Sequence, residues 1–472
     1  MTSARVEPDG VVGPERSEVP LTLDEEAPKT LGLLDQGAFW ANLGVSLLGF
    51  SGALFLLDPL GGKPVTLTAA LLAAVVGSLI GTVMVGLAAI PGTRTGKPAM
   101  VLLRGLFGAR LSYIPTVLNI VQMLGWGAFE LWVIAIGAQA IFGTAVPYSV
   151  WVIVAGVVTI ALTIRPLGAL RLLRRYVTVG VVISMIWLAV ALVAKGPTLA
   201  DGGSWEAFAP AVDYVIALSV SWVPMAADIA RHSRSSGAAF TGVVGGYTIA
   251  QVACLALGIA ALALVGNDVD RVWDPFVAAP LGGLFFGILV LREVDQSFAN
   301  VYSTTMSIQN LAPRWDRRVV SVVIGVFTTG IALLADVNSY GAFLSVIGAV
   351  FVPMFAVLVI DYFLLRGASR WNTAGDAPAR WSMIVPWILG FFAFWIVTAP
   401  PEEMSWWDRA WVGVREAIGF VHQPWMSATL AAFLAAALVT LLLHPLTRRR
   451  AVRIHSHPRS PTAVRRCRRI QR

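Results

Sequence analysis

Charged residues are scarce in this sequence. Only 13% of its 472 residues are Asp, Glu, Lys or Arg, and 57% are hydrophobic. A soluble globular domain carries roughly a quarter charged residues, so this composition excludes one. Apolar stretches of about 20 residues, the length that crosses the hydrocarbon core of a bilayer, recur along almost the whole chain. We therefore expect a single polytopic membrane domain and no separate soluble domain.

Cysteine and histidine are also rare, with two and five residues. Cys254 lies in an apolar stretch and Cys467 near the C-terminal end, so no disulfide is expected. The histidines lie at the ends of apolar stretches or in the C-terminal tail, so a proton path would have to use carboxylates. The sequence has no HExxH motif, nucleotide-binding Gly-rich loop or Cys/His cluster, which disfavours an intramembrane enzyme and predicts no cofactor. A channel would need a repeated pore segment or charged rings, and neither is found.

Twelve apolar stretches are long enough to be transmembrane helices. Their continuous runs of Leu, Val, Ala and Ile lack the strict alternation of membrane β-barrel strands, so an all-α protein is expected. We group them as helices 1–5 over about residues 31–194, helices 6–10 over about 212–365 and helices 11–12 over about 383–446. The predicted spans are residues 31–57, 66–90, 114–142, 148–164, 176–194, 212–230, 240–265, 276–311, 318–335, 340–365, 383–400 and 425–446.

Basic residues predict the orientation. Lys and Arg concentrate in the loops after the second, fourth, sixth, eighth and tenth spans, which places both termini in the cytoplasm of a cell (inner) membrane protein. The C-terminal tail, residues 447–472, has ten Arg and no acidic residue. Such a tail is typical of contact with anionic lipid headgroups, so no nucleic-acid partner is expected. Residues 1–30 are polar without an apolar signal-peptide core, and we expect a disordered cytoplasmic segment there.

Two of the spans carry signals for interruption. The first has weak helix formers at its centre, including Asn42 and Ser46, and the sixth has Ser219, Ser221 and Pro224. Candidate substrate contacts in these two spans are Asn42, Ser46, Ser219 and Trp222. Backbone groups freed by a break must face protein, water or a ligand. The alternative to a break in each span is an intact helix, in which the small residues only allow close helix packing and the proline only causes a kink. Two breaks five spans apart are what an inverted five-helix repeat produces, with substrate between them.

Four stretches together resemble the nucleobase-cation symporter family, which carries purines, pyrimidines, hydantoins and vitamins. They are YGAFLSVIGAVFVPMFAVLVIDYFLLR (340–366), GWGAFELWVIAIGAQAI (125–141), AADIARHSR (226–234) and FANVYSTTMSIQNLAP (298–313). The resemblance covers about residues 31–445. It implies a LeuT-type fold of five plus five inverted helices, with helices 1 and 6 broken and two further C-terminal helices.

Within this family, helices 1 and 8 look most like the branch proposed to import hydroxymethylpyrimidine, the pyrimidine precursor of thiamine. The stretches that carry this likeness are LDQGAFWANLGVSLLGFSGALFLL and EVDQSFANVYSTTMSIQNL. The resemblance implies a secondary active transporter coupled to H⁺ or Na⁺, with a small heterocycle as substrate. A cytosine or purine permease is the alternative, followed by an amino-acid carrier of the same architecture.

Trp126 and Glu130 lie four residues apart on helix 3 and therefore share a face. An indole offers a flat surface on which a pyrimidine can stack, although a packing or interfacial role for Trp126 remains the alternative. A protonated carboxyl one turn away can accept from an exocyclic amine and donate to the neighbouring ring nitrogen. The resemblance places Trp126 at the stacking position and Glu130 where the family usually has Gln, which suggests an amine-bearing ring and a proton in the transport cycle.

Helix 8 carries two polar faces. Glu293, Ser297 and Asn300 fall on one side of a 3.6-residue helix, and Arg292 and Asp295 fall on another. The first face is expected to address the substrate, and Asn300 matches the substrate-binding Asn of the family. On the second face Arg292 is expected to form an ion pair with Asp295 or Glu293. This pair either takes part in the energy coupling of transport or only stabilises the structure.

Sodium-using family members bind the ion with a Ser-Thr pair on helix 8 and with backbone carbonyls. The matching positions here are Val294 and Asp295, so the hydroxyl pair is absent. Asp295 then ligates a cation, takes up the proton, or is neutralised by Arg292 acting as a fixed cation. The candidate cation site comprises Asn42, Val45, Leu291 and Asp295.

Asp228 and Arg231 end helix 6 in the Asp-x-x-Arg pattern of the family. They are interpreted as a gate or anchoring pair on the cytoplasmic side. The positive-inside rule alone would already explain Arg231 at this position.

Overall fold

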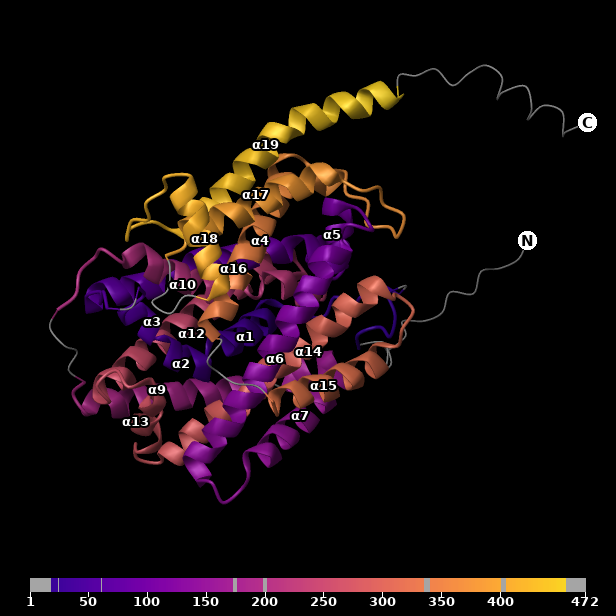
Figure 1. Cartoon of the computed structure of the whole chain (residues 1–472). Coiled ribbons are helices and arrows are strands. Elements are labelled where there is room, and N and C mark those ends of the chain that lie inside the picture. The colour runs from indigo at the N-terminus through magenta and orange to yellow at the C-terminus, as the bar shows by residue number, and fades with distance from the viewer. Residues whose placement is uncertain are drawn as a thin grey trace, which may run out of the picture.

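The computed structural model describes residues 18–23, 25–60, 62–172, 176–197, 202–334, 340–399 and 405–455. These residues are helical, and their only extended pairings are two isolated bridges, Leu31 with Ser233 and Val65 with Ser204. Figure 1 shows the helices packed into one body, with α19 extending beyond it. The predicted all-α class is confirmed.

All twelve predicted spans correspond to helical structure. The first span forms three short helices, α1 (Leu33–Gly44), α2 (Leu47–Gly52) and α3 (Leu54–Leu57). The sixth forms α10 (Phe208–Val220), a 3₁₀ turn at Val223–Met225 and α11 (Ala226–Ala230). The others form α4 (Leu67–Thr95), α6 (Tyr113–Phe142), α7 (Tyr148–Ile164), α9 (Thr178–Ala194), α12 (Ser236–Leu264), α14 (Gly282–Leu311), α15 (Arg317–Ala332), α16 (Tyr340–Val359), α17 (Trp381–Val397) and α19 (Ala428–His455).

Four shorter helices were not predicted: α5 (Ala99–Phe107), α8 (Pro166–Leu172), α13 (Asp274–Val277) and α18 (Trp406–Ala417). By length and hydropathy alone, five helical segments of the described chain can cross a membrane, namely α4, α6, α10 to α11, α12 and α16. Two bent pairs, α1 with α2 to α3 and α7 with α8, raise that number to seven if each pair is one span.

Both predicted helix breaks are present. Val45 and Ser46 have extended backbone between α1 and α2, and the two halves of this span meet at an angle of 53°. The Ser46 hydroxyl caps α2 by accepting a hydrogen bond from the Leu48 amide. In the sixth span α10 ends at Val220, and Pro224 lies within the 3₁₀ turn that precedes α11.

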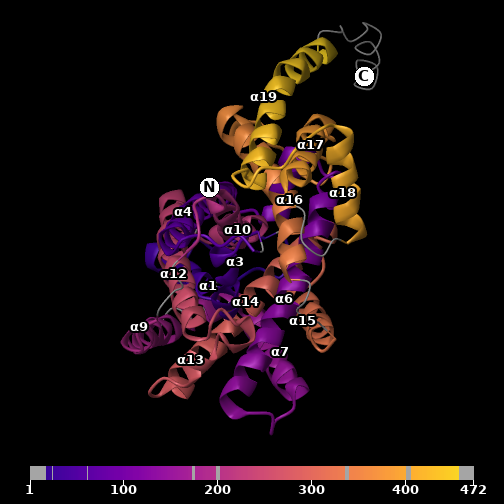
Figure 2. The same cartoon turned by 60° about the vertical axis from the view of Figure 1, so that its left-hand side comes forward.

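The helices fall into two groups that meet along the broken spans. In one group, α1 packs on α12, and both α10 and α12 pack on α4. In the other, α6 packs on α14 and α7 packs on α15. Figure 2 shows the first group at the left, the second at the right and below, and α17 to α19 above the second group. The two broken spans thus lie close to α6 and α14 of the opposite group.

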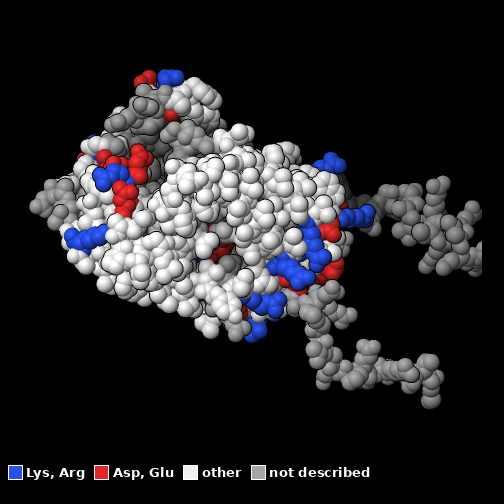
Figure 3. All heavy atoms as spheres, turned by 90° about the horizontal axis from the view of Figure 1, so that it is seen from below, with Lys and Arg blue, Asp and Glu red and all other residues white. Residues whose placement is uncertain are grey.

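The surface matches a membrane environment. Figure 3 shows charged side chains gathered towards two opposite ends of the face in view, with a largely uncharged surface between them. Large apolar side chains on the outside of the helices are well exposed, including Ile249 at 74% and Val157 at 61%. Such a belt is stable only when lipid covers it.

An N-terminal strap, defined as residues 18–23 and 25–30, runs across one end of the body. The Glu18 carboxylate accepts hydrogen bonds from the amides of Leu167 (2.7 Å) and Gly168 (3.1 Å). At its other end, Lys29 donates to the carbonyl of Thr93 in α4 at 2.9 Å. Of the segment predicted to be disordered, residues 1–17 and Asp24 lie outside the described residues, as do residues 456–472 of the basic tail.

Candidate functional site

A small cavity of about 40 Å³ lies between the two helix breaks. Gly44 and Ser46 line it from the first broken span, and Ser221 and Trp222 line it from the second. Ser46 and Trp222, two of the predicted substrate contacts, therefore face a common space. Other walls come from α6, α12 and α14, so both helix groups contribute to the cavity.

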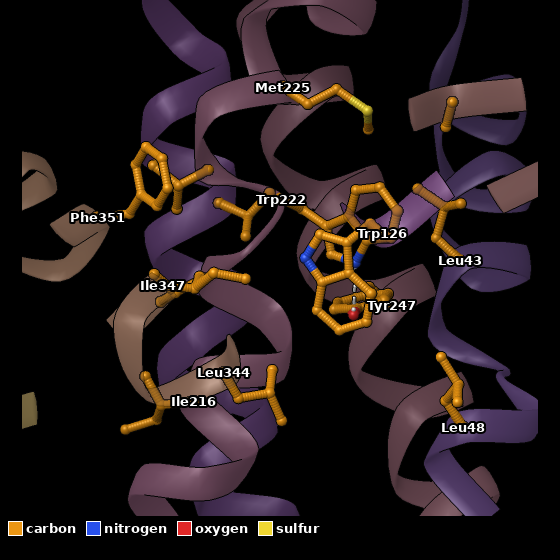
Figure 4. Packing of buried hydrophobic residues seen from close by; sticks show 14 of the residues in the cluster. Leu43, Leu48, Trp126, Ile216, Trp222, Met225, Tyr247, Leu344, Ile347 and Phe351 are labelled. Carbon is orange, nitrogen blue, oxygen red and sulfur yellow. Dashed lines mark hydrogen bonds between the residues drawn. The ribbon is translucent and has the colours of Figure 1, made fainter. Parts of the chain in front are cut away.

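Three aromatic side chains line this cavity. Trp126 of α6, Trp222 and Tyr247 of α12 all line it, and the indole N–H of Trp222 donates to the Tyr247 hydroxyl at 3.0 Å. Figure 4 shows the three rings converging between Leu43 on one side and Leu344 on the other. Flat aromatic rings can stack with a planar heterocycle and enclose it.

Glu130 brings a carboxyl group to the same cavity, one helical turn after Trp126. It is within hydrogen-bonding reach of the Glu293 carboxyl on α14. Glu293 also accepts from the Leu47 amide (2.6 Å) and from Arg292 (3.0 Å). An ionised carboxylate only accepts hydrogen bonds, whereas a carboxyl group that carries a proton can also donate one. When protonated, Glu130 can therefore present a hydrogen-bond donor towards the cavity.

Arg292 is fully buried, and its guanidinium binds the backbone of the first helix break. Nη1 donates to the carbonyl of Asn42 at 2.8 Å and to that of Val45. The Oδ1 atom of Asp295 lies 3.7 Å from the same nitrogen. The backbone carbonyls of Asn42 and Val45, two residues of the predicted cation site, therefore accept hydrogen bonds from a guanidinium.

Gln296 completes the contacts between α14 and the break. Its amide donates to the carbonyls of Val45 (2.9 Å) and Leu43 (3.3 Å), and its side chain lines the cavity. Carbonyls at the C-terminal end of a helix such as α1 have no partner within the helix. Side chains of α14 provide those partners here, which is why the break is tolerated inside the protein.

Asn300 and Ser297 are fully buried on α14 but do not line the cavity as the structure stands. Asn300 lies against Gly127 of α6, next to Trp126. Among the described residues, neither its amide nor the Ser297 hydroxyl has a hydrogen-bond partner. Unpaired polar groups in a protein interior are rare and need an explanation. A polar ligand that reaches past Trp126 would supply one.

Ser219 and the Asp228 and Arg231 pair lie elsewhere. The Ser219 hydroxyl donates to Gln251 at 2.8 Å and faces α12, and Ser219 does not line the cavity. Asp228 accepts from the amide of Ala99 and the hydroxyl of Ser303, both at 2.8 Å, so it anchors α11 to α5 and α14.

Arg231 contacts different partners from Asp228. It donates to His232 at 3.2 Å and to the Tyr302 hydroxyl at 3.4 Å. Among the described ion pairs, none joins Arg231 to Asp228. These contacts attach Arg231 to the residue after it and to α14, as an anchoring role requires.

Sequence reasoning missed the contribution of α12. Tyr247 and Gln251 line the cavity one turn apart, and Cys254 lies beside them with its thiol donating to the Ser46 carbonyl at 3.2 Å. Polar residues at positions i and i+4 of an otherwise apolar span are a signal that could have identified this face. Gln296 of α14 was missed as well.

Three solved structures with the same fold are remote in sequence. Mhp1, a nucleobase-cation-symport-1 family transporter solved in a closed conformation with bromovinylhydantoin bound, is 16% identical, with a TM-score of 0.72 over 93% of this chain and 96% of its own. A Na⁺-coupled sialic acid symporter in a substrate-bound outward-open state is 12% identical, with a TM-score of 0.61 over 90% and 93%. MhsT in complex with L-phenylalanine is 15% identical, with a TM-score of 0.50 over 86% and 97%.

These likenesses establish a LeuT-type fold, in which the first and sixth spans are broken. A comparison with curated protein sequences finds no significant match. A family model does match, over residues 64–374, and its description is a permease for cytosine/purines, uracil, thiamine and allantoin. That family consists of transporters rather than enzymes. The chain therefore belongs to the family of permeases for cytosine/purines, uracil, thiamine and allantoin.

Proposed function

We propose that this protein imports hydroxymethylpyrimidine, a nucleobase-like heterocycle, across the cell (inner) membrane by alternating access coupled to H⁺ or Na⁺. The observation that carries this proposal is the cavity shared by Trp126, Glu130 and the two helix breaks. It combines a stacking surface with a carboxyl that can carry a proton. The basic loops favour a cytoplasmic location for both termini.

An aminopyrimidine fits the chemistry of these groups. Its ring would stack on the Trp126 indole. A protonated Glu130 carboxyl would donate to a ring nitrogen and accept from the neighbouring amine. The unpaired amide of Asn300 can meet a further polar group on the ring. A carboxyl in place of the family's Gln therefore favours a ring that carries an amine next to an acceptor nitrogen.

The division of the walls between two helix groups suggests how transport proceeds. Ser46 and Trp222 belong to the broken spans, whereas Trp126 and Glu130 belong to α6 of the other group. Rocking one group against the other would expose the cavity first to one side of the membrane and then to the other. The substrate would remain bound at the fixed site between the breaks.

Uptake of radiolabelled hydroxymethylpyrimidine into proteoliposomes tests this function. Unlabelled hydroxymethylpyrimidine should compete fully. Cytosine, hypoxanthine, thiamine and neutral amino acids should compete progressively less, in this order. Stronger competition by cytosine or hypoxanthine would instead support the alternative, a cytosine or purine permease. Uptake that no unlabelled pyrimidine reduces would refute the substrate class.

A further inference from the structure

The break between α1 and α2 is a suitable cage for a small cation. Asn42 and Val45 lie three residues apart at the end of α1, and their carbonyl oxygens point to one place, where Arg292 Nη1 contacts both. Carbonyls of an unwound segment, together with the negative end of a half-helix dipole, are the groups that coordinate Na⁺ in transporters with broken helices. The cage therefore has the chemistry of a sodium site.

Arg292 occupies that cage with a permanent positive charge. A guanidinium is protonated at any physiological pH and offers only donors, so it satisfies the carbonyls as an ion would. The carboxyl groups of Glu293 at 3.0 Å and Asp295 at 3.7 Å balance its charge. Gln296 donates to the Val45 carbonyl as well and takes up its remaining acceptor capacity. A free cation at this place would meet donors and a like charge.

This arrangement differs from an ordinary buried ion pair. In an ordinary buried ion pair the arginine needs only a carboxylate partner. Arg292 has this partner in Glu293, to which its Nη2 atom donates. The other nitrogen, Nη1, is directed to the backbone of a different span. The link joins α14 of one helix group to the break in the other, at the point where the groups must move.

We propose that Arg292 is a tethered cation that replaces a coupling sodium ion, so that substrate binding and transport by this protein are independent of sodium. The inference rests on the proposed transport function, and it removes Na⁺ from the two coupling ions left open there. Arg292 acts as a positioning residue, since it fixes the helix break and not the substrate.

Two measurements on purified full-length protein test this proposal. The first is equilibrium binding of ²²Na⁺, which needs no substrate; no saturable binding is expected. The second is counterflow of labelled hydroxymethylpyrimidine in proteoliposomes, with equal rates expected in sodium chloride and in choline chloride. Saturable ²²Na⁺ binding, or stimulation of counterflow by sodium of about tenfold, overturns the proposal. Absence of counterflow in both salts refutes the transport function, and the binding measurement then decides the role of Arg292 alone.

Variants separate this role from a purely structural one. Arg292→Ala opens the cage and leaves the Glu293 and Asp295 carboxylates without their cation, so sodium but not choline should raise its melting temperature and restore counterflow. Arg292→Lys keeps the charge and should stay insensitive to sodium, which preserves the test if Arg292→Ala does not fold. Arg271→Ala, which removes an exposed arginine paired with Asp274, is the matched control and should resemble wild type. An Arg292→Lys protein that requires sodium contradicts the proposal.

Discussion

Glu130 is the residue at which this chain departs most informatively from its family. Where the resemblance expects a Gln, the chain has a carboxyl that lies in the cavity and contacts a second carboxyl, Glu293. An amide can form hydrogen bonds to a heterocycle equally well, but it cannot take up or release a proton. The exchange of one amide for one acid therefore adds a titrating group to a site that otherwise needs none.

Glu130→Gln separates binding from proton exchange. We expect the variant to bind substrate within about tenfold of wild type and to lose most of the pH dependence of uptake, because the amide keeps hydrogen-bonding groups but carries no exchangeable charge. Uptake rates between mildly acidic and mildly alkaline pH measure this effect. A pH profile that coincides with that of wild type would assign the proton to another group.

Trp126 is expected to carry the stacking interaction. Trp126→Ala removes the indole from the cavity wall, so the Kd for the pyrimidine should rise by about tenfold or more while the folded yield is retained. Trp132→Ala is the matched control, because Trp132 lies on the same helix, is only partly buried and does not line the cavity. Isothermal titration of both variants measures the difference. Unchanged affinity in Trp126→Ala would leave this residue with a packing role.

At the scale of helices, the break between α1 and α2 depends on close contact with α12. A Cβ atom added at Gly44 would lie 2.7 Å from the Tyr247 carbonyl and 2.9 Å from the Ala250 side chain. Backbone cannot yield at such distances without moving a helix. The last residue of α1 thus needs glycine for space rather than for a positive φ angle.

Gly44→Ala should therefore destabilise the protein by about 1–3 kcal/mol, the usual cost of overpacking. It should also reduce transport, because the displaced break would carry Ser46 out of the cavity. Gly37→Ala is the control within the same helix, since nothing lies within 4 Å of the added atom. Melting temperatures of both variants in detergent, followed by uptake, give the comparison. Equal stability of the two proteins would show that α12 adjusts freely.

Helices were predicted well where hydrophobicity determines them. The spans and both breaks follow from apolar length and from residues such as Pro224, which act locally. The short helices α5 and α18 were missed because neither is long enough to give a membrane signal. The partners of Arg292 could not be predicted, because its contacts with Asn42 and Val45 join residues some 250 positions apart. The sequence shows that a charged Arg292 lies in an apolar span, but only the fold shows which oxygen atoms its guanidinium contacts.

At the scale of the whole molecule, the N-terminal strap connects the two helix groups. Its first residues are held by α8 and by the start of α15, and its last residues contact α4 and His232 after α11. Arg317 organises the first attachment. Its guanidinium donates to the carbonyls of Thr163 and Ile164 at the end of α7 and to Pro20 of the strap.

Arg317→Ala should loosen this end of the protein. The substitution leaves carbonyl groups at the end of α7 and one in the strap without their donor, and each such buried group costs about 1–3 kcal/mol. We expect a clearly lower melting temperature and faster protease cleavage between residues 18 and 30 than in wild type. Arg318→Ala is the control, because the Arg318 side chain is next to Arg317 in the sequence but is exposed. If both variants melt and are cleaved like wild type, water satisfies these carbonyls and the strap is held by its remaining contacts, chiefly those of Glu18 and Lys29.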